Sequence, residues 1–186
     1  MTANLTRKAA LENIFRLDEG HLLERPEHEP ETPVEELEGR RGYDPDFLEG
    51  WRIKLPKAAG DTAGDIQRLR RGGAGVELKY HNFYVIMSVS RRMPMLTASN
   101  IDGNESRRVS RLSSWSFDGR LDKEDQWGDI LYYKQGLDCG HMVRREDPVW
   151  GDLEEARRAN FDTFHFTNSC PQMPGVNQVK WIGLEN

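Results

Sequence analysis

The sequence LDCGHMVRR, residues 137–145, follows the strand-like ILYYK and brings an acid, a glycine and a histidine together within four positions. Asp138 and His141 lie three residues apart around Gly140, and glycine at that position favours a tight turn. Such a turn presents both side chains on one side and leaves the imidazole exposed with its tautomer fixed. This stretch is therefore predicted to carry a general base.

A second informative stretch is FTNSCPQMPGVNQVKWIGLE, residues 166–185, in which Asn177 and Glu185 lie eight residues apart. Eight residues are just over two helical turns, so on a helix both side chains share one face. A carboxamide oxygen and a carboxylate on one face suit Mg²⁺, which keeps most of its waters and takes few protein ligands. The spacing predicts a magnesium site on a helix over 177–185.

Together the two stretches resemble the DNA/RNA non-specific endonucleases of the endonuclease G type, which have the ββα-metal (His-Me finger) fold. The pattern of that family is Asp-Arg-Gly-His, then Asn-x-x-Pro-Gln, then Asn with Glu eight residues later. The corresponding stretches here are DCGH, NSCPQ and the pair Asn177 and Glu185. The resemblance runs from about Gly42 to the last residue and includes GYDPDFL and the NIDG turn.

This resemblance implies a Mg²⁺-dependent, sugar-non-specific endonuclease that hydrolyses phosphodiester bonds in DNA and RNA, with Mn²⁺ as a substitute metal. It implies that His141 deprotonates the attacking water. Asn177 would be the only direct protein ligand of the hydrated metal, and Glu185 would hold metal-bound waters. Homodimers are common in the family, so a homodimer is a further expectation.

The remaining residue roles that the resemblance implies concern the phosphate and the frame of the site. Arg111, in RLSSW, matches the family arginine that contacts the scissile phosphate. Asn168 matches the asparagine that supports the site, and Asp138 would brace the turn. Arginines cluster along the chain, and those predicted to bind substrate are Arg107, Arg108, Arg111 and Arg144.

The chain departs from the family pattern in two places. It has Cys139 where the family has arginine, and a thiol cannot make an arginine's charged, bidentate contacts. We therefore expect weakened activity. Three explanations for Cys139 remain open: a natural variant, a deliberate change that disarms the enzyme, and a sequence divergence compensated by Arg144 or Arg145. The second departure is the end at Asn186, where the family continues, so the fold is expected to be truncated at its C-terminus.

Charge divides the chain into two parts. It has 186 residues and a net charge of -5, and residues 1–40 hold more acidic than basic residues while the rest is neutral overall. An amphipathic helix is predicted over 5–24 and an extended, solvated Glu/Pro linker over 24–40. Residues 1–40 thus form an acidic leader, which a protein partner is expected to bind, and residues 41–186 the nuclease domain.

Apolar patterning predicts an α+β fold around a mainly antiparallel sheet. The expected strands are 76–89, 95–98, 115–117, 130–134 and 164–167, and the expected helices are 152–161, capped by Asp152, and 177–185. No apolar run reaches the roughly 18 residues of a membrane span. No signal-peptide pattern opens the chain, so a cytoplasmic protein without a membrane partner is predicted.

Two alternatives remain open at this point. Cys139, His141, His165 and Cys170 are ligand types that zinc accepts, although the C-x-H spacing is tighter than in common zinc sites. His165 lies among aromatic residues, which favours a packed core histidine instead. The second alternative is a catalytically inactive module that keeps the nuclease fold and binds nucleic acid or a protein partner.

Overall fold

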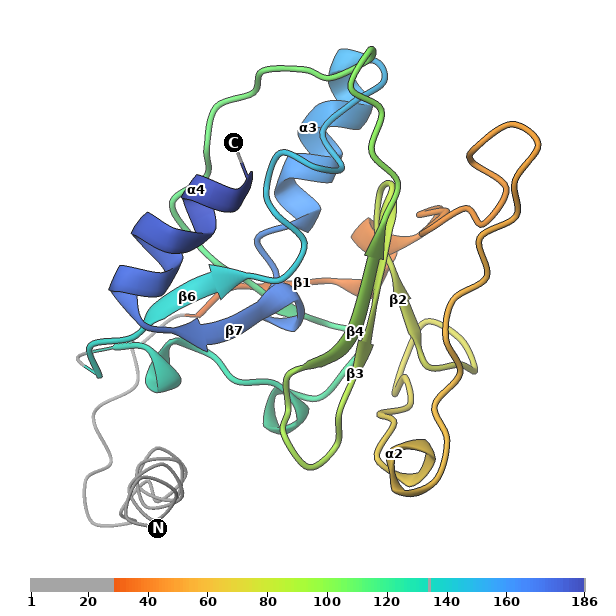
Figure 1. Ribbon diagram of the computed structural model, residues 1–186. Coiled ribbons are helices and arrows are strands. Elements are labelled where there is room, and N and C mark those ends of the chain that lie inside the picture. The colour runs from red at the N-terminus through yellow and green to blue at the C-terminus, as the bar shows by residue number, and fades with distance from the viewer. Residues whose placement is uncertain (1–28, 134, 186) are drawn as a thin grey trace, which may run out of the picture.

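The computed structural model describes residues 29–133 and 135–185, apart from the side chains of Ile182 and Glu185. These residues form an α+β fold, as predicted (Figure 1). Its elements are β1 (Glu31–Thr32), η1 (Val34–Leu37), α2 (Asp61–Gly64), β2 (Glu77–Lys79), β3 (Phe83–Met87), β4 (Pro94–Ser99), β5 (Phe117–Asp118), η2 (Lys123–Asp125), η3 (Asp129–Leu131), β6 (Asp138–His141), α3 (Leu153–Asp162), η4 (Phe166–Asn168), β7 (Ser169–Gln172), η5 (Val176–Trp181) and α4 (Ile182–Glu185).

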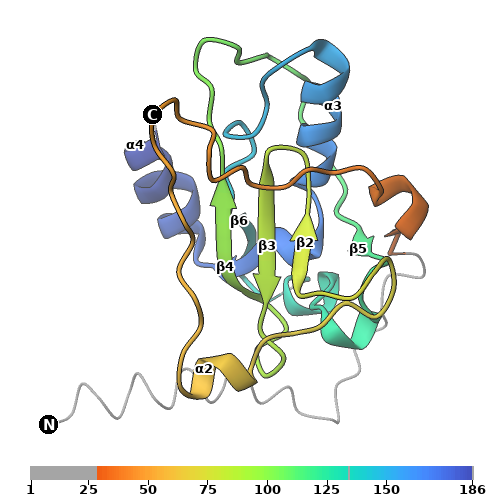
Figure 2. The same cartoon turned by 90° about the vertical axis from the view of Figure 1, so that its right-hand side faces the viewer.

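An antiparallel sheet of order β2-β3-β4 forms the centre of the molecule (Figure 2). The single strand predicted over 76–89 is wrong, because the chain reverses between β2 and β3. Asn82 there adopts a positive φ of 66°, a conformation that asparagine tolerates better than most residues. The main-chain N–H of Tyr80 donates to the carbonyl of Phe83 at 2.9 Å and closes the turn.

The described part of the predicted linker, residues 29–40, packs onto the domain instead of being solvated. β1 pairs in parallel with β5, and Thr32 is buried opposite Asp118. Leu37 lies in the hydrophobic core with 3% of its surface exposed. Thr32 and Leu37 are the buried residues of this segment and attach it to the domain, although most of its other residues are exposed. Residues 1–28, including the helix predicted over 5–24, lie outside the described residues, so the acidic leader stays a prediction.

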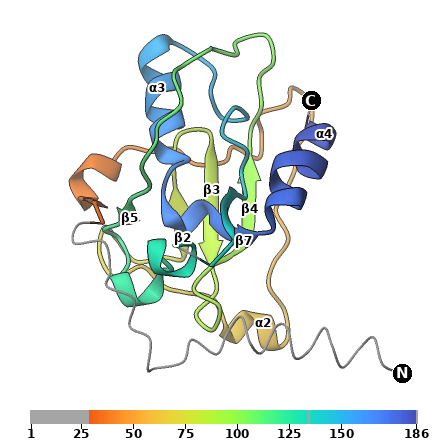
Figure 3. The ribbon, with the colours of Figure 1, turned by 90° about the vertical axis from the view of Figure 1, so that its left-hand side faces the viewer.

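The antiparallel strand pair β6–β7, whose strands are connected by residues 142–168 including α3, lies beside the central sheet (Figure 1). It is followed by the C-terminal helix, which consists of π-helical η5 and α4 (Figures 1 and 3). The predicted strands over 130–134 and 164–167 are wrong, because the described residues of these ranges form the 3₁₀ turns η3 and η4, further turns and one isolated bridge at His165. Leu131 and Phe166 are buried in one cluster with Phe117. A buried 3₁₀ turn shows the same short apolar run as a strand.

Both predicted helices of the domain are present. Asp152 caps α3, since its Oδ1 accepts a hydrogen bond from the main-chain N–H of Glu155 at 2.8 Å. Ala156 and Ala159 of α3 are fully buried and pack with Val149. The C-terminal helix covers the range predicted for it. Across the described residues, the structure contains no helix with the length and apolar character that membrane crossing requires.

Candidate active site

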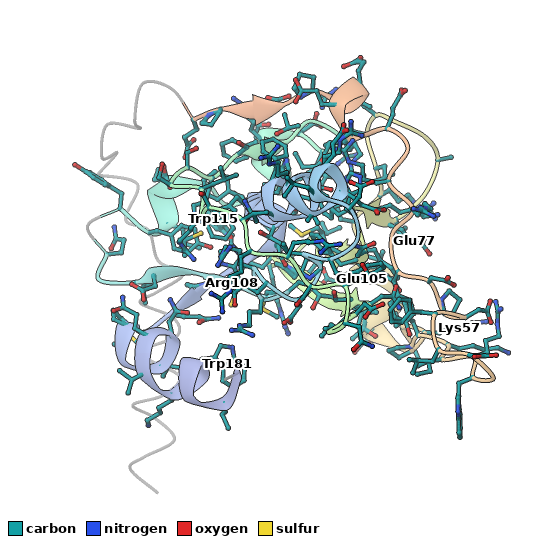
Figure 4. All side chains as sticks on the ribbon, turned by 90° about the horizontal axis from the view of Figure 1, so that it is seen from above. Lys57, Glu77, Glu105, Arg108, Trp115 and Trp181 are labelled. Carbon is teal, nitrogen blue, oxygen red and sulfur yellow. The ribbon has the colours of Figure 1, made fainter. Side chains whose placement is uncertain are left out.

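A cleft of about 800 Å³ lies between the β6–β7 strand pair, the C-terminal helix and the segment that joins β4 to β5. Figure 4 shows Arg108 and Trp115 on the body of the molecule and Trp181 on the helix across from them. The cleft is lined by Arg111, Trp115, Leu137, Asp138, Cys139, His141, Arg144, Arg145, Glu146, Asn177, Gln178 and Trp181. The fold thus brings five of the predicted site residues together from three separate stretches of the chain.

His141 is the last residue of β6 and is half-buried, so the exposed imidazole on a tight turn is wrong. Its ring lies 4.5 Å from the ring of Trp115 and 4.9 Å from that of Phe164 between centroids. Gly140 leaves room for the side chain of Gln172 on the neighbouring strand, because a Cβ atom there would lie 2.2 Å from Cδ of Gln172. The glycine therefore serves a strand pair and not a turn.

The electrostatic surroundings of His141 favour a neutral imidazole. Burial, and then the charges of Arg111 and Arg145, lower its pKa to about 3. Its Nε2 atom is buried and has no hydrogen-bond partner among the described residues. The ring is therefore neutral at pH 7, which is the protonation state that a general base requires.

We expect His141 to make stability fall between pH 7 and pH 5. Its lowered pKa means that the unfolded state binds the proton near pH 6.5 while the folded state does not, so lowering the pH favours unfolding. Urea denaturation at pH 7 and pH 5 measures how much the free energy of unfolding decreases between them. This decrease should be smaller by roughly 2 kcal/mol in His141→Gln than in the unchanged chain. Equal losses in both proteins would contradict the low pKa.

Asp138 holds two amides of the C-terminal helix. Its Oδ2 atom accepts hydrogen bonds from Nδ2 of Asn177 at 2.9 Å and from Nε2 of Gln178 at 2.8 Å. Because the amide nitrogen of Asn177 is used in this way, its Oδ1 atom is the one left for a cation. Asp138 therefore orients Asn177, the predicted metal ligand. The position of Asp138 in the motif did not reveal this contact across the cleft.

Asn168 is fully buried behind the cleft and supports the chain just after His141. Its Oδ1 atom accepts from the main-chain N–H of Val143 at 2.8 Å, and its Nδ2 atom donates to the carbonyls of Val143 and Thr163, both at 3.1 Å. Its own carbonyl accepts from Met142 N–H at 2.9 Å. These contacts fit the supporting role predicted for this residue.

The predicted arginines have different surroundings. Arg111 is exposed and its guanidinium carbon lies 5.3 Å above the ring of Phe164, at the cleft. Arg144 also lines the cleft and forms an ion pair with Glu146. Arg107 donates to the carbonyl of Gly151 at 2.7 Å and, like exposed Arg108, is not among the lining residues.

Arg145 is a cleft residue that the sequence interpretation named only as compensation for Cys139. The adjacent pair Arg144 and Arg145 was the available signal, but it does not tell which arginine faces the site. The thiol of Cys139 packs with the apolar cluster around Tyr132, and burial raises its pKa to about 12. Glu185 lies in α4, and its side chain is outside the described residues, so its role stays a prediction.

The zinc alternative is wrong, because the described residues, which include all four proposed ligands, contain no metal-binding group of three His, Cys, Asp or Glu side chains. Cys170 pairs with Gly140, and neighbouring residues on a strand point to opposite faces. Cys170 therefore lies on the opposite face of the β6–β7 strand pair from Cys139 and His141. His165 is fully buried, and its two ring nitrogens contact the carbonyl of Asp162 and the hydroxyl of Thr32, both at 2.9 Å.

Two antiparallel strands followed by a helix, with a histidine on the first strand and an asparagine on the helix lining one cleft, define the ββα-metal class of nuclease folds. Residues 65–186 match the family described as DNA/RNA non-specific endonuclease. This match covers more than half of the chain, and the chain belongs to that family.

The chain is also similar to two individual proteins. The chain is 41% identical over 172 residues to the uncharacterized protein y4fB of Sinorhizobium fredii (strain NBRC 101917 / NGR234), covering 83% of this chain and 25% of that protein. It also resembles a chain in the crystal structure of the EndoG/EndoGI complex, with a TM-score of 0.50 and 19% identity. That match covers 69% of this chain and 53% of the other. The chain thus spans about half or less of the length of these proteins.

Proposed function

We propose that this chain is a Mg²⁺-dependent endonuclease that hydrolyses phosphodiester bonds in DNA and RNA without sugar specificity. The observation that carries the proposal is the convergence on one cleft of a neutral His141, the carboxamide of Asn177 and the guanidinium of Arg111. Phosphodiester hydrolysis requires a nucleophile made at neutral pH and positive charge on the phosphate. The three groups can supply a base, a metal ligand and that charge.

In the proposed reaction, a water molecule between His141 and the phosphate loses a proton to the imidazole and attacks phosphorus, while the bond from phosphorus to the leaving sugar oxygen breaks. Arg111 is exposed, so its guanidinium can approach two phosphate oxygens and offset the charge that develops on them. Trp115 and Phe164 pack against the imidazole and limit its rotation. These contacts orient the base toward the cleft.

The residues at the cleft fit a hydrated Mg²⁺ ion. Asn177 offers the free Oδ1 atom of its carboxamide, and Asp138 is a carboxylate whose Oδ1 atom receives no hydrogen bond from the described residues. Neutral and anionic oxygen atoms are the ligands and water acceptors that Mg²⁺ prefers. When bound, the cation supplies positive charge for the phosphate and the leaving oxygen.

We expect Asp138→Ala to weaken metal binding about tenfold or more. Without the carboxylate, the amide of Asn177 is no longer held by its nitrogen, and loss of such orienting contacts costs about 10- to 100-fold in metal affinity. Calorimetric titration with Mg²⁺ and Mn²⁺ measures the effect, with Asp61→Ala in exposed α2 as the matched control. Affinity that is unchanged in Asp138→Ala would contradict the orienting role.

The proposed activity is tested by incubating the purified chain with supercoiled plasmid and with single-stranded RNA. Cleavage of both in Mg²⁺ or Mn²⁺, and its loss with EDTA, is the expected result. Cleavage that persists in EDTA would contradict metal dependence, and cleavage of only one nucleic acid would contradict the lack of sugar specificity. Binding of duplex DNA without cleavage in any divalent metal would favour the inactive module.

We expect Cys139→Arg to increase the cleavage rate about tenfold. The thiol is neutral, whereas an arginine at this edge of the cleft adds a charged hydrogen bond of roughly 1.5–3 kcal/mol to the phosphate. Initial rates on plasmid measure the change, with Cys139→Ser as the control that removes the thiol without adding charge. Equal rates for the unchanged chain and Cys139→Arg would support compensation by Arg144 or Arg145.

The inactive module is the second candidate, because Cys139 leaves the cleft without the charge found at this position in the family. Arg111, Arg144 and Arg145 still line the cleft in that case and favour binding of phosphate backbones without base recognition. A homodimer and a protein partner for the N-terminal segment stay predictions of either candidate.

A further inference from the structure

The segment between β4 and β5 passes the cleft without helix or strand and carries Arg111. Its main chain is anchored at one end by the N–H of Arg107, which donates to the carbonyl of Val149 at 2.9 Å. At the other end the N–H of Ser116 donates to the carbonyl of Phe164 at 2.9 Å. Eight residues separate these two anchors, so the position of Arg111 depends on what holds the segment between them.

Two side chains hold the main chain between those anchors, among the residues that the structure describes. Nδ2 of Asn160 donates to the carbonyl of Ser110 at 3.2 Å. Nη1 of Arg145 donates to the carbonyl of Val109 at 3.3 Å and to Oδ1 of Asn160 at the same distance. The amide of Asn160 therefore joins α3, the arginine of the cleft and the segment in one bridge.

Asn160 is well placed to act as a fixed support. It has 3% of its surface exposed, and it lies in α3, whose alanines are fully buried in the domain. Ser110 is the residue directly before Arg111. Restraining its carbonyl limits the backbone rotations that would otherwise move the guanidinium relative to the phosphate.

We propose that Asn160 is a positioning residue, which fixes Ser110 and thereby places Arg111 over the cleft for its contact with the phosphate. This inference rests on the proposed nuclease function. Asn160 and Arg145 have different roles. Asn160 positions the segment that carries Arg111, whereas Arg145 helps to position this segment and also adds its own positive charge to the cleft. A displacement of about 1 Å at a reacting group costs roughly 100-fold in rate.

The first test is a double-mutant cycle between Asn160→Asp and Arg111→Ala. Aspartate keeps the size of the side chain and the acceptor for Arg145, but it cannot donate to the Ser110 carbonyl. We expect Asn160→Asp to lower kcat/KM for plasmid cleavage about 10- to 100-fold alone and to add no loss when Arg111 is already alanine. Asn104→Ala, an exposed asparagine of the same segment, is the control.

Equal losses from Asn160→Asp in both backgrounds would overturn the proposal, because they would show that Asn160 does not act through Arg111. So would a kcat/KM unchanged by Asn160→Asp alone. Asn160→Ser is the second variant if aspartate prevents folding, since its shorter side chain also gives up the contact with Ser110 and introduces no charge.

The second test does not require activity, and it separates this inference from the proposed function. Hydrogen exchange is measured in the unchanged chain and in Asn160→Asp for peptides that cover 106–115 and, as an internal reference, 83–87 of β3. Faster exchange confined to 106–115 is expected even if the chain cuts no nucleic acid, in which case the proposed function alone fails. Unchanged exchange over 106–115, or an equal increase in both peptides, would overturn the positioning role.

Discussion

Replacing His141 with alanine is expected to lower the rate of plasmid and RNA cleavage by roughly 1,000-fold. The neutral imidazole is the base in the proposed reaction, and a positioned general base contributes about 10²- to 10⁴-fold. Binding of nucleic acid should be almost unchanged, because the phosphate contacts come from Arg111 and the other arginines of the cleft. The variant should therefore lose kcat while keeping its affinity for DNA in EDTA.

Initial cleavage rates and fluorescence anisotropy with labelled DNA measure these two effects. His81→Gln is the matched control, because His81 contacts Asp162 and is not among the residues that line the cleft. His141→Gln fills more of the space between Trp115 and Phe164 and guards against a loss caused by misfolding. A His141 variant that melts normally and keeps more than a tenth of the rate would remove this residue from the mechanism.

Asp118→Asn is expected to destabilise the fold by about 3–5 kcal/mol, the largest effect on stability that we predict. Asp118 is fully buried and pairs with Arg120, whose Nη2 atom lies 2.6 Å from its Oδ2 atom. The hydroxyl of Tyr80 also donates to this carboxylate. Asparagine leaves the charge of Arg120 buried without its partner, which is the costly case.

Urea denaturation at pH 7 measures this loss. The control is Asp122→Asn, because Asp122 pairs with Arg71 while both side chains are well exposed, and such pairs contribute about 0–1 kcal/mol. Burial opposes ionisation of Asp118, but the hydrogen bonds and charge of Arg120 outweigh it and keep its pKa below the usual range. Its contribution is therefore present above about pH 4 and is lost as the pH falls further. Equal effects of the two substitutions would contradict the buried ion pair.

The helices and the motif positions could be predicted from local sequence because their signals are local. Asp152 precedes a run with helical spacing, and its cap is present. The spacing of Asn177 and Glu185 indicates one helix, and that helix is present. Elements that depend on distant partners were predicted less well. Thr32 and Leu37 lie in a polar segment. They are buried because Thr32 pairs with β5 and Leu37 packs into the hydrophobic core, and both contacts involve residues far away in the sequence.

Within the candidate site, residue types and spacing named Asp138, His141 and Asn177, the family resemblance named Arg111, and the fold brings all four to one cleft. Their environments were not predictable in the same way. The imidazole was expected to be exposed, but Trp115 and Phe164 bury it, and they come from other parts of the chain. Burial and charge, which set its pKa, depend on neighbours in space.

The sequence alone thus determined the α+β class and the family pattern, and it led to the predicted base, metal ligand and phosphate contact. Such information resides in residue identity and in spacings of a few positions, which helices and strands convert directly into faces. Only the tertiary structure decided that Asp138 holds the amide of Asn177 and that Asn160 supports Ser110. Those pairs are 39 and 50 residues apart, and no local periodicity relates side chains across such distances.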